Sequence, residues 1–426
     1  MIQWPAPVAD GPVRGLVVVP GSKSASARSL LLAALAEASS TLTGVLDSRD
    51  TALMRAGLTV LGAEFTDLPD GRVGVRPAAS ILGGGTIDCG LAGTVMRFLP
   101  PLAALASPAT SFTGDAAASA RPVDALLAAL VALGAEVSEP HQLPFTVSGT
   151  PAVHGGRVTV DASASSQFVS ALLLAGARYP DGLEVTHSGH TLPSLPHIEM
   201  TATLLARRGV TVDHPSEFTW RVAPGPIAAI DETVEPDLTN AATLLAAALV
   251  TGGELHTAWP EGSVQAADGL LAVLATFGAR LSYSGSGNDR TVTVSGPDGV
   301  RGADVDLHAV SELTPVAAAL AAVASGPSTI RGVAHIRGHE TDRLAALAAG
   351  LTALGVDANQ TADGLSVTPT PRHGGTFHTH ADHRLAHAAA LLGLVTPGVE
   401  LDDVGCTTKT LPDFVGTWSR LVGVAS

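Results

Sequence analysis

Residues 16–28 read Leu-Val-Val-Val-Pro-Gly-Ser-Lys-Ser-Ala-Ser-Ala-Arg. The apolar run from Leu16 to Val19 predicts a buried strand, and the Ala/Leu-rich stretch from Ala25 to Ala36 predicts a helix. The polar loop between them precedes a helix N-terminus, where free N–H groups and the helix dipole favour an anion. Lys23 adds a point charge to this loop, and Arg28 follows on the same helix. The loop is not a P-loop because G-x-x-x-x-G-K-[ST] is absent, and taken alone it fits an ordinary capped turn equally well.

Lysine is scarce in this chain. Of the 24 basic residues only Lys23 and Lys409 are lysine, and the rest are arginine. Both lysines lie in short polar loops rich in Ser or Thr. Lysine is a compact, flexible point charge whereas arginine is a planar fork, so we predict a functional role for both lysines. Chance is the alternative, since two lysines must fall somewhere.

The composition limits the class of protein. A chain of 426 residues has the length of two or three domains, and 46% apolar with 4% aromatic residues predicts cores of Ala, Leu and Val. The two cysteines give no disulfide framework and residues 1–15 show no secretion signal, which favours a cytoplasmic location. A net charge of −15 argues against nucleic acid as a partner, and the apolar runs are too short to cross a membrane. An anionic ligand would therefore need positive potential focused in a cleft.

A pattern of strand, polar loop and Ala-rich helix recurs six times, with 70 to 75 residues between successive loops. A second motif ends a helical pattern with glycine before a short strand, as a helix C-terminus should. The loops are Lys23-Ser24, Gly93-Thr94, Ser165-Ser166-Gln167, Glu235-Pro236-Asp237, Glu312-Leu313-Thr314-Pro315 and Asp382-His383-Arg384. The glycine motifs are Leu61-Gly62-Ala63, Leu133-Gly134-Ala135, Arg208-Gly209-Val210, Phe277-Gly278-Ala279 and Leu354-Gly355-Val356, with a faded sixth at Val422-Gly423-Val424.

Six α/β modules of this length form either one ring or two domains of three. Prolines cluster between Pro193 and Pro236 and favour a boundary before Asp237. If the modules of each trio are similarly oriented, their helix N-termini converge, and two facing trios would surround one cleft with six N-termini. Such a cleft would attract anions without surplus basic side chains.

Three polar segments have both a structural and a functional interpretation. Glu312 at a predicted helix start is either a cap or, when buried among anions, a base. The Ser-rich loop at 163–166 is either an N-cap or a phosphate site. The stretch from His378 to Arg384 contains metal-ligand residue types but lacks a metal-binding spacing, so no metal is predicted.

Together these loops resemble one family, 3-phosphoshikimate 1-carboxyvinyltransferase, also called 5-enolpyruvylshikimate-3-phosphate synthase. The matching motifs occur in family order and span nearly the whole chain. They are Pro20-Gly21-Ser22-Lys23-Ser24, Ala92-Gly93-Thr94-Val95-Met96-Arg97, Arg121-Pro122, Ser165-Ser166-Gln167, Glu340-Thr341-Asp342-Arg343-Leu344, Asp382-His383-Arg384 and Thr408-Lys409-Thr410.

The resemblance implies an α/β fold of two similar domains, each of three βαβαββ-like repeats, as an inside-out α/β barrel with its active site in the interdomain cleft. It places residues 22–234 in the first domain and residues 1–21 plus 235–426 in the second, joined by a double crossover. The implied reaction is an addition–elimination in which the 5-hydroxyl of shikimate 3-phosphate attacks C2 of phosphoenolpyruvate while C3 is protonated, and phosphate then leaves. It implies no cofactor, only these two small-molecule partners, and a monomer.

The resemblance also implies two overlapping sets of binding residues. For shikimate 3-phosphate they are Lys23, Ser24, Arg28, Ser165, Ser166, Gln167, Ser194, Glu312 and His339. For phosphoenolpyruvate they are Lys23, Gly93, Arg97, Arg121, Gln167, Arg343, Arg384 and Lys409. The implied catalytic residues are Glu312 as proton acceptor, Glu340 as proton donor with Lys409 as a competing donor, and Lys23 and His339. Gly93 keeps the small residue that the family associates with glyphosate sensitivity.

The chain departs from the family pattern near these residues. Leu91 and His335 replace the usual Asn, His339 the usual Lys, Glu312 the usual Asp, and His197 the usual Tyr. If His339 must be cationic, activity should fall as the pH rises through its pKa, giving a lower pH optimum than in a lysine-bearing relative.

Two alternatives to this function stay open. The sister enolpyruvyl transferase that acts on UDP-N-acetylglucosamine typically carries a Cys before the Arg-Pro pair, and residues 114–120 contain none. A paralogue that binds these anions without turnover is favoured only by the departures at Glu312, His335 and His339.

Overall fold

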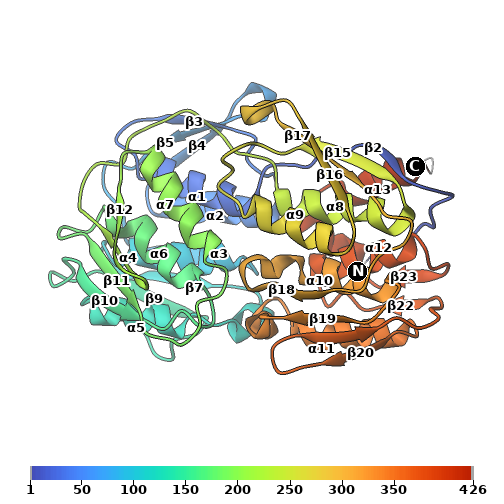
Figure 1. Cartoon of the computed structure of the whole chain (residues 1–426). Coiled ribbons are helices and arrows are strands. Elements are labelled where there is room, and N and C mark those ends of the chain that lie inside the picture. The colour runs from blue at the N-terminus through green and yellow to red at the C-terminus, as the bar shows by residue number, and fades with distance from the viewer. Residues whose placement is uncertain (1, 424–426) are drawn as a thin grey trace. The chain divides into compact units, whose positions relative to one another are not determined.

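The structure is a computed structural model that describes residues 2–423, coloured along the chain in Figure 1. The chain divides into two compact units. The first unit contains Gly21–Glu235, and the second contains the chain up to Pro20 and again from Pro236. Within the described residues there are six sheets, three in each unit.

The three sheets of the first unit share one topology: a parallel pair of strands followed by two antiparallel pairings. The strands are β3 (Ser40–Thr43), β4 (Glu64–Asp67), β5 (Val73–Arg76), β6 (Thr86–Asp88), β7 (Thr110–Thr113), β8 (Glu136–Val137), β9 (Phe145–Ser148), β10 (Gly156–Val160), β11 (Leu183–His187), β12 (Val212–Ser216), β13 (Thr219–Val222) and β14 (Glu232–Thr233). The sheet orders are β14-β3-β5-β4, β6-β7-β9-β8 and β10-β11-β13-β12. Because β14 follows the third repeat but pairs with β3 of the first, the end of this unit closes onto its beginning.

The second unit repeats this topology twice and shortens it once. Its strands are β1 (Trp4–Pro5), β2 (Arg14–Leu16), β15 (Glu254–Ala258), β16 (Arg280–Ser284), β17 (Thr291–Ser295), β18 (Asp304–Asp306), β19 (Ser328–Arg331), β20 (Asp357–Gln360), β21 (Leu365–Thr368), β22 (Gly375–Phe377) and β23 (Val399–Leu401). The sheet orders are β16-β17-β15-β2, β18-β19-β21-β20 and β1-β23-β22. In the last sheet β1 supplies the antiparallel partner that a hairpin supplies elsewhere.

Each repeat has a core helix after its first strand and an outer helix after its second. The core helices are α1 (Lys23–Ala34), α3 (Gly93–Phe98) with α4 (Pro100–Ala103), α6 (Gln167–Gly176), α8 (Leu238–Thr251), α10 (Thr314–Val323) and α12 (His383–Gly393). The outer helices are α2 (Arg49–Val60), α5 (Asp124–Ala132), α7 (Pro196–Arg207), α9 (Ala267–Thr276), α11 (Arg343–Ala353) and α13 (Phe414–Val422). Short 3₁₀ helices are η1 (Pro69–Gly71), η2 (Ala116–Ala120), η3 (Gly287–Asp289), η4 (His308–Leu313), η5 (Ala334–Gly338) and η6 (Val404–Lys409).

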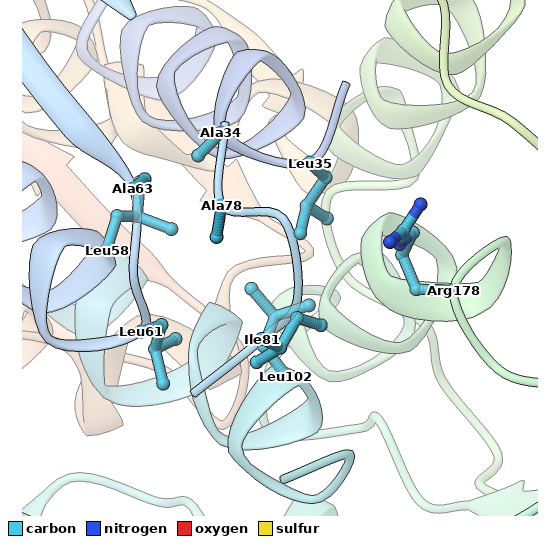
Figure 2. Close-up of a pocket in the computed structure, with 9 residues that line it drawn as sticks. All are labelled: Ala34, Leu35, Leu58, Leu61, Ala63, Ala78, Ile81, Leu102 and Arg178. Carbon is cyan, nitrogen blue, oxygen red and sulfur yellow. The ribbon is translucent and has the colours of Figure 1, made fainter. Parts of the chain in front are cut away.

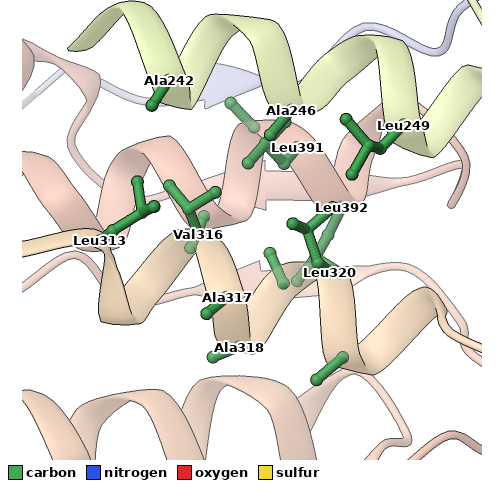
Figure 3. Close-up of a cluster of buried hydrophobic side chains, with 14 of the residues drawn as sticks. Ala242, Ala246, Leu249, Leu313, Val316, Ala317, Ala318, Leu320, Leu391 and Leu392 are labelled. Atoms are coloured by element: carbon green, nitrogen blue, oxygen red, sulfur yellow. The ribbon is translucent and has the colours of Figure 1, made fainter. Parts of the chain in front are cut away.

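The core helices of the second unit pack through Ala and Leu, as the composition predicts. Figure 3 shows Ala242 and Ala246 of α8, Val316 of α10 and Leu391 of α12 within one buried cluster. All eleven residues of α12 are buried. Small side chains let these helices approach closely, so the residue that begins each helix is held by a rigid, fully packed element.

The predicted sixfold repeat is confirmed. Every predicted loop leads directly into a core helix. The five glycine motifs follow the outer helices α2, α5, α7, α9 and α11, and their glycines have φ between +78° and +109°, a conformation that glycine adopts without steric cost. In the sixth motif Gly423 follows α13 with φ +74°, while Val424 lies outside the described residues.

The predicted bounds of the opening elements were wrong. The strand β2 covers Arg14–Leu16, and α1 covers Lys23–Ala34. Leu16, the last residue of β2, is 63% exposed because β2 is an edge strand, and beyond it Val17 is buried while Val18 is 70% exposed. The helix begins earlier because the Ser22 hydroxyl accepts a hydrogen bond from the Ala25 N–H and caps it.

Side chains cap three of the six core helices, which weakens the predicted attraction of those helix N-termini for anions. The side chains of Ser22, Asp237 and Asp382 accept hydrogen bonds from the first-turn N–H groups of α1, α8 and α12. Two of these caps are carboxylates, which offset the positive end of the helix dipole. The N-cap side chains of α3, α6 and α10 make no such bond. Positive potential for anions must therefore come largely from arginine and lysine side chains.

The first unit also contains a small apolar cavity, drawn in Figure 2. It is lined by Ala34, Leu35, Leu58, Leu61, Ala63, Ala78, Ile81, Leu102 and Arg178. The cavity lies at the C-terminal end of α1, which at 1.5 Å per residue is roughly 16 Å from Lys23, so it lies far from the residues of the candidate site. No helix among the described residues has the length and hydrophobicity to cross a membrane.

Candidate active site

Arg28 is the buried cation of the first unit, with 1% of its surface exposed. Its Nε donates to Thr201 Oγ1 at 2.7 Å, Nη1 to the Ser24 carbonyl at 2.9 Å, and Nη2 to Ser170 Oγ and the His197 carbonyl. The Phe98 ring lies 5.0 Å below the guanidinium. Burial lowers the pKa of Arg28 to about 9, which leaves it charged at neutral pH. These contacts fix the start of α1 against α6 and α7.

Arg97 on α3 connects this helix to the loop at Pro122 and to the start of α6. Its Nη1 donates to Gln167 Oε1 at 2.9 Å, and Nε and Nη2 donate to the Pro122 carbonyl. Arg121 donates to the Leu91 carbonyl at 2.9 Å. A Cβ on Gly93 would lie 2.9 Å from Arg121 Nη2, so any larger residue would force the guanidinium to move. The structure thus brings together Gly93, Arg97, Arg121 and Gln167, as the sequence predicts.

The Ser-rich loop before α6 is held by a histidine that the sequence analysis missed. His187, at the end of β11, is 5% exposed, and its Nδ1 accepts from the Ala162 N–H at 3.0 Å. Ser165 Oγ accepts from the Gln167 N–H at 3.3 Å, while Ser166 makes no side-chain cap. The loop thus contacts the first N–H of α6 through Ser165, and its interpretation as a phosphate site stays a prediction. Ser194 has φ +52°, a left-handed conformation uncommon outside glycine.

Arg343 is the centre of the second unit's charged cluster, with a side chain only 1% exposed. Its Nε donates to Asp382 Oδ2 at 2.6 Å, Nη1 to Glu312 Oε2 at 3.0 Å, and Nη2 to Glu340 Oε2 at 2.9 Å. Three carboxylates therefore surround one guanidinium, and they raise the pKa of Arg343 well above its usual value despite its burial. Arg343 is the first residue of α11, which Asp342 caps, and it is buried although it begins a helix.

Glu312 lies at the end of η4 and does not cap α10, so the capping interpretation is wrong too. Besides Arg343, it faces Arg384 Nε at 3.3 Å. The two guanidinium groups outweigh the effect of burial and hold the pKa of Glu312 well below its usual value. Asn240 on α8 orients Arg384, since its Oδ1 accepts from Arg384 Nη1 at 3.1 Å and its Nδ2 donates to the Thr410 carbonyl.

Lys409 and Glu340 form an ion pair, with Lys409 Nζ donating to Glu340 Oε1 at 2.8 Å. Since Arg343 donates to the other oxygen, both oxygens of this nearly buried carboxylate accept from cations. Both predicted proton-donor candidates thus lie in direct contact.

The pKa of His339 does not lie near neutrality, where the predicted pH dependence of activity requires it to be. Its Nδ1 lies 3.0 Å from Arg343 Nη1. Burial and the adjacent Arg343 lower the pKa of His339 to about 3, and burial together with His308 lowers that of His335 to about 4. The expected decline of activity through a near-neutral His339 pKa therefore loses its basis.

No group of three or more metal-ligating side chains lies within binding range anywhere in residues 2–423. In the His378–Arg384 stretch, His378 instead pairs with Asp402, and Asp382 pairs with Arg343.

Asp382, a residue of the predicted loop at 382–384, orients Arg343. The sequence analysis missed the other side chains that orient the predicted cations: Ser170 and Thr201 at Arg28, and Asn240 at Arg384. Their only sequence signal is their place on the core and outer helices, since each is a polar residue in an otherwise apolar stretch. Such residues are buried with their hydrogen bonds satisfied.

Comparison with known proteins agrees with this geometry. The family model of EPSP synthase (3-phosphoshikimate 1-carboxyvinyltransferase) matches residues 8–418. A 3-phosphoshikimate 1-carboxyvinyltransferase from Kocuria rhizophila is 50% identical over 99% of this chain and 96% of its own length. Two structures of EPSP synthase from Acinetobacter baumannii superpose with TM-scores of 0.81 and 0.78, at 24% and 23% identity, and each comparison covers at least 98% of both chains. The mixed α/β fold is therefore that of EPSP synthases, and the chain belongs to the EPSP synthase (3-phosphoshikimate 1-carboxyvinyltransferase) family.

Proposed function

We propose that this protein transfers the enolpyruvyl group of phosphoenolpyruvate to the 5-hydroxyl of shikimate 3-phosphate and releases phosphate, a step of aromatic amino-acid biosynthesis. The observation that carries the proposal is that the family's motif residues supply buried cations in each unit: Arg28 and Arg97 on core helices of the first, and Arg343 at the start of α11 and Arg384 on α12 in the second. Each substrate has a carboxylate and a phosphate, so the pair brings about five or six negative charges. Lys23, Arg28, Arg97, Arg121, Arg343, Arg384 and Lys409 supply seven positive ones.

Shikimate 3-phosphate binds to the start of α1 and the Ser-rich loop in this proposal. Lys23, Ser24, Arg28, Ser165, Ser166, Gln167 and Ser194 contact it, with Glu312 and His339 at its hydroxyl. Arg28 has five N–H donors and makes four bonds within the protein, which leaves one for the ligand. Its role is therefore mainly to position Ser24 and α7.

Phosphoenolpyruvate binds to Lys23, Gly93, Arg121, Gln167, Arg343, Arg384 and Lys409. Arg97 belongs to this set chiefly as a positioning residue, because it donates to Gln167 and to the Pro122 carbonyl next to Arg121. When the substrate's anionic groups take up Arg343 and Arg384, Glu312 loses part of the interaction that lowers its pKa. The base thus becomes stronger only when its substrate is present.

Glu340 and Lys409 act as one proton-donating unit. Because both oxygens of Glu340 accept from cations, the carboxylate itself holds no proton in this arrangement, and Lys409 Nζ is the nearest proton source. A proton delivered to C3 leaves Lys409 through Glu340 and returns by the same path during elimination.

We expect Glu340→Gln to block the exchange of the C3 hydrogens of phosphoenolpyruvate with deuterated solvent, and Lys409→Met to slow the exchange by about 100-fold. Mass spectrometry of recovered phosphoenolpyruvate measures this exchange. Arg420→Met, at a surface ion pair, is the control. If Lys409→Met exchanged these hydrogens at the parent rate, Glu340 would be the proton donor by itself and the proposed role of Lys409 would be wrong.

A coupled phosphate-release assay tests the function. Release with shikimate 3-phosphate and phosphoenolpyruvate supports the proposal. Release only with UDP-N-acetylglucosamine would assign the sister activity, and binding of both anions by calorimetry without release would make the chain a non-catalytic paralogue.

We expect Gly93→Ala to raise the KM for phosphoenolpyruvate by about tenfold, which corresponds to about 1.4 kcal/mol, because the added Cβ displaces the Arg121 guanidinium. The KM for shikimate 3-phosphate should stay within twofold. Gly225→Ala is the matched control, since a Cβ there meets nothing within 4 Å. The same variant is expected to be less sensitive to glyphosate than the parent, measured as the inhibitor concentration for half activity. An unchanged KM for phosphoenolpyruvate would remove Arg121 from its binding set.

We also propose that the protein acts in the cytoplasm as a monomer that needs no cofactor. The supporting observation for the cytoplasm is the pair of free cysteines, Cys89 and Cys406, whereas the monomer and the lack of a cofactor are what the family resemblance implies. Light scattering at micromolar concentration and activity in metal-chelated buffer test these two points.

A further inference from the structure

Three histidine rings form a row that begins beside Glu312. The ring centroids of His339 and His335 are 5.8 Å apart, and those of His335 and His308 are 6.2 Å apart, each pair packed edge to face. His335 lies on η5 and His339 directly follows it, while η4 begins at His308 and also carries Glu312. The two short helices thus place an unbroken series of titratable side chains from the carboxylate to His308.

The contacts of His339 fix its tautomer. Arginine only donates hydrogen bonds, so His339 Nδ1, at 3.0 Å from Arg343 Nη1, is the acceptor and the ring proton is on Nε2. The same Nδ1 lies 3.5 Å from Glu312 Oε1. Two acceptors then face each other, which is unfavourable until a proton lies between them. A proton taken up by Glu312 has His339 Nδ1 as its nearest acceptor once Arg343 turns to the substrate.

His335 is suited to continue this path. Its Nε2 is buried and has no hydrogen-bond partner among the described residues, which is costly for a polar atom without a function. A neutral imidazole accepts a proton at one nitrogen and donates one at the other. At ring separations near 6 Å one bridging water suffices to connect the nitrogens of adjacent rings.

We propose that His339, His335 and His308 carry the proton that Glu312 removes from the substrate hydroxyl out to solvent. The inference rests on the proposed function, in which Glu312 is the proton acceptor. The substrate O–H bond breaks and a Glu312 O–H bond forms. Glu312 then returns this proton to His339 Nδ1, His339 releases its Nε2 proton toward His335, and His308 passes a proton to solvent. His339 and His335 are then left with their protons on the opposite ring nitrogens, so each ring must turn over or exchange its proton with water before the next turnover restores the starting tautomer.

The surroundings of His339 and His335 keep both rings neutral before turnover. His339 faces Arg343, Glu312 and Glu340, and His335 faces His308, Glu312 and Arg343. Burial lowers the pKa of both rings, that of His335 to about 4 and that of His339 to about 3, so each ring is neutral before turnover and holds the transferred proton only briefly.

The test is steady-state kinetics of His335→Gln in light and heavy water. We expect kcat to fall about tenfold, the solvent isotope effect on kcat to increase, and added imidazole to restore activity, with the KM for phosphoenolpyruvate unchanged. His308→Gln should have a smaller effect of the same kind because it lies at the outer end of the row. His373→Gln, an exposed histidine of the same unit, is the control and should behave as the parent.

Parent values of kcat and of the isotope effect in His335→Gln would overturn the relay. A lower kcat with an unchanged isotope effect and no rescue by imidazole would also overturn it, because that result marks a structural role. If His335→Gln lacks the parent circular-dichroism spectrum, His308→Gln decides by the same criteria. A parent enzyme that releases no phosphate from the two substrates would instead refute the proposed function, independently of either histidine variant.

Discussion

Replacing Asp382 by Ala is expected to lower the free energy of unfolding of the second unit by about 3–5 kcal/mol, because it leaves the Arg343 guanidinium buried without its closest partner. The variant also removes the cap of α12, since Asp382 Oδ1 accepts from the Arg384 N–H. Both arginines proposed to hold phosphoenolpyruvate would lose their positions, so kcat/KM should fall by at least about 100-fold. Urea denaturation followed by tryptophan fluorescence measures the first effect, since three of the four tryptophans, Trp4, Trp259 and Trp418, lie in this unit.

Two further variants show whether the loss of stability comes from leaving a charge buried without a partner or from breaking an ion pair as such. Asp413→Ala breaks an ion pair with Arg420 in which both side chains are 67% exposed, and should cost less than about 1 kcal/mol. The double variant Asp382→Leu with Arg343→Met should recover most of the stability but none of the activity, because no buried charge is left unpaired. An Asp382→Ala variant as stable as Asp413→Ala would show that Arg343 does not depend on this carboxylate.

The period of the sequence was sufficient to predict six α/β repeats, whereas their division into two groups of three was an alternative to one ring that the prolines before Asp237 and the family resemblance favoured. Each repeat must place a glycine where the outer helix turns back into a strand, and Gly62, Gly134, Gly209, Gly278 and Gly355 all have positive φ. Bounds were less predictable at β2, where the run Leu16–Val19 has the composition of a buried strand but lies at a sheet edge. The position of a strand in its sheet depends on its pairing partner, which can lie more than 200 residues away in the sequence, as β15 does from β2. Local sequence therefore does not predict which strand lies at the edge.

In the candidate site, too, the sequence indicated which residue types are present but not which residues contact one another. Motif positions identified Arg343, Glu312 and Lys409, because anionic substrates call for cations and a base. Their pairing could not be predicted, since a carboxylate at a helix start suits a cap as well as an ion pair. The pKa of His339 could not be predicted for the same reason: a histidine next to a buried arginine titrates far from its ordinary pKa, and their proximity is a property of the fold.

Buried neutral histidines should also make the second unit labile to acid. Burial lowers the pKa of His335 to about 4, that of His339 to about 3, and that of His387 well below its usual value. In the unfolded chain these groups bind a proton near pH 6.5, so the unfolded state takes up more protons and stability is lost as the pH falls below 6.5. Between pH 7.5 and 5.5 each histidine should reduce the free energy of unfolding by about 1.4 kcal/mol, and the three together by about 4 kcal/mol.

His387 allows this prediction to be tested outside the site. Its ring packs 5.0 Å from that of Phe414, and both of its nitrogens are buried without a hydrogen-bond partner among residues 2–423. His387→Leu should therefore be at least as stable as the parent at pH 7.5, and its loss of stability on going to pH 5.5 should be smaller by about one third. His373→Leu, at an exposed position, should lose as much as the parent. Urea denaturation at the two pH values measures these losses, and an equal loss in His387→Leu and the parent would mean that His387 binds its proton as readily in the folded unit as in the unfolded chain.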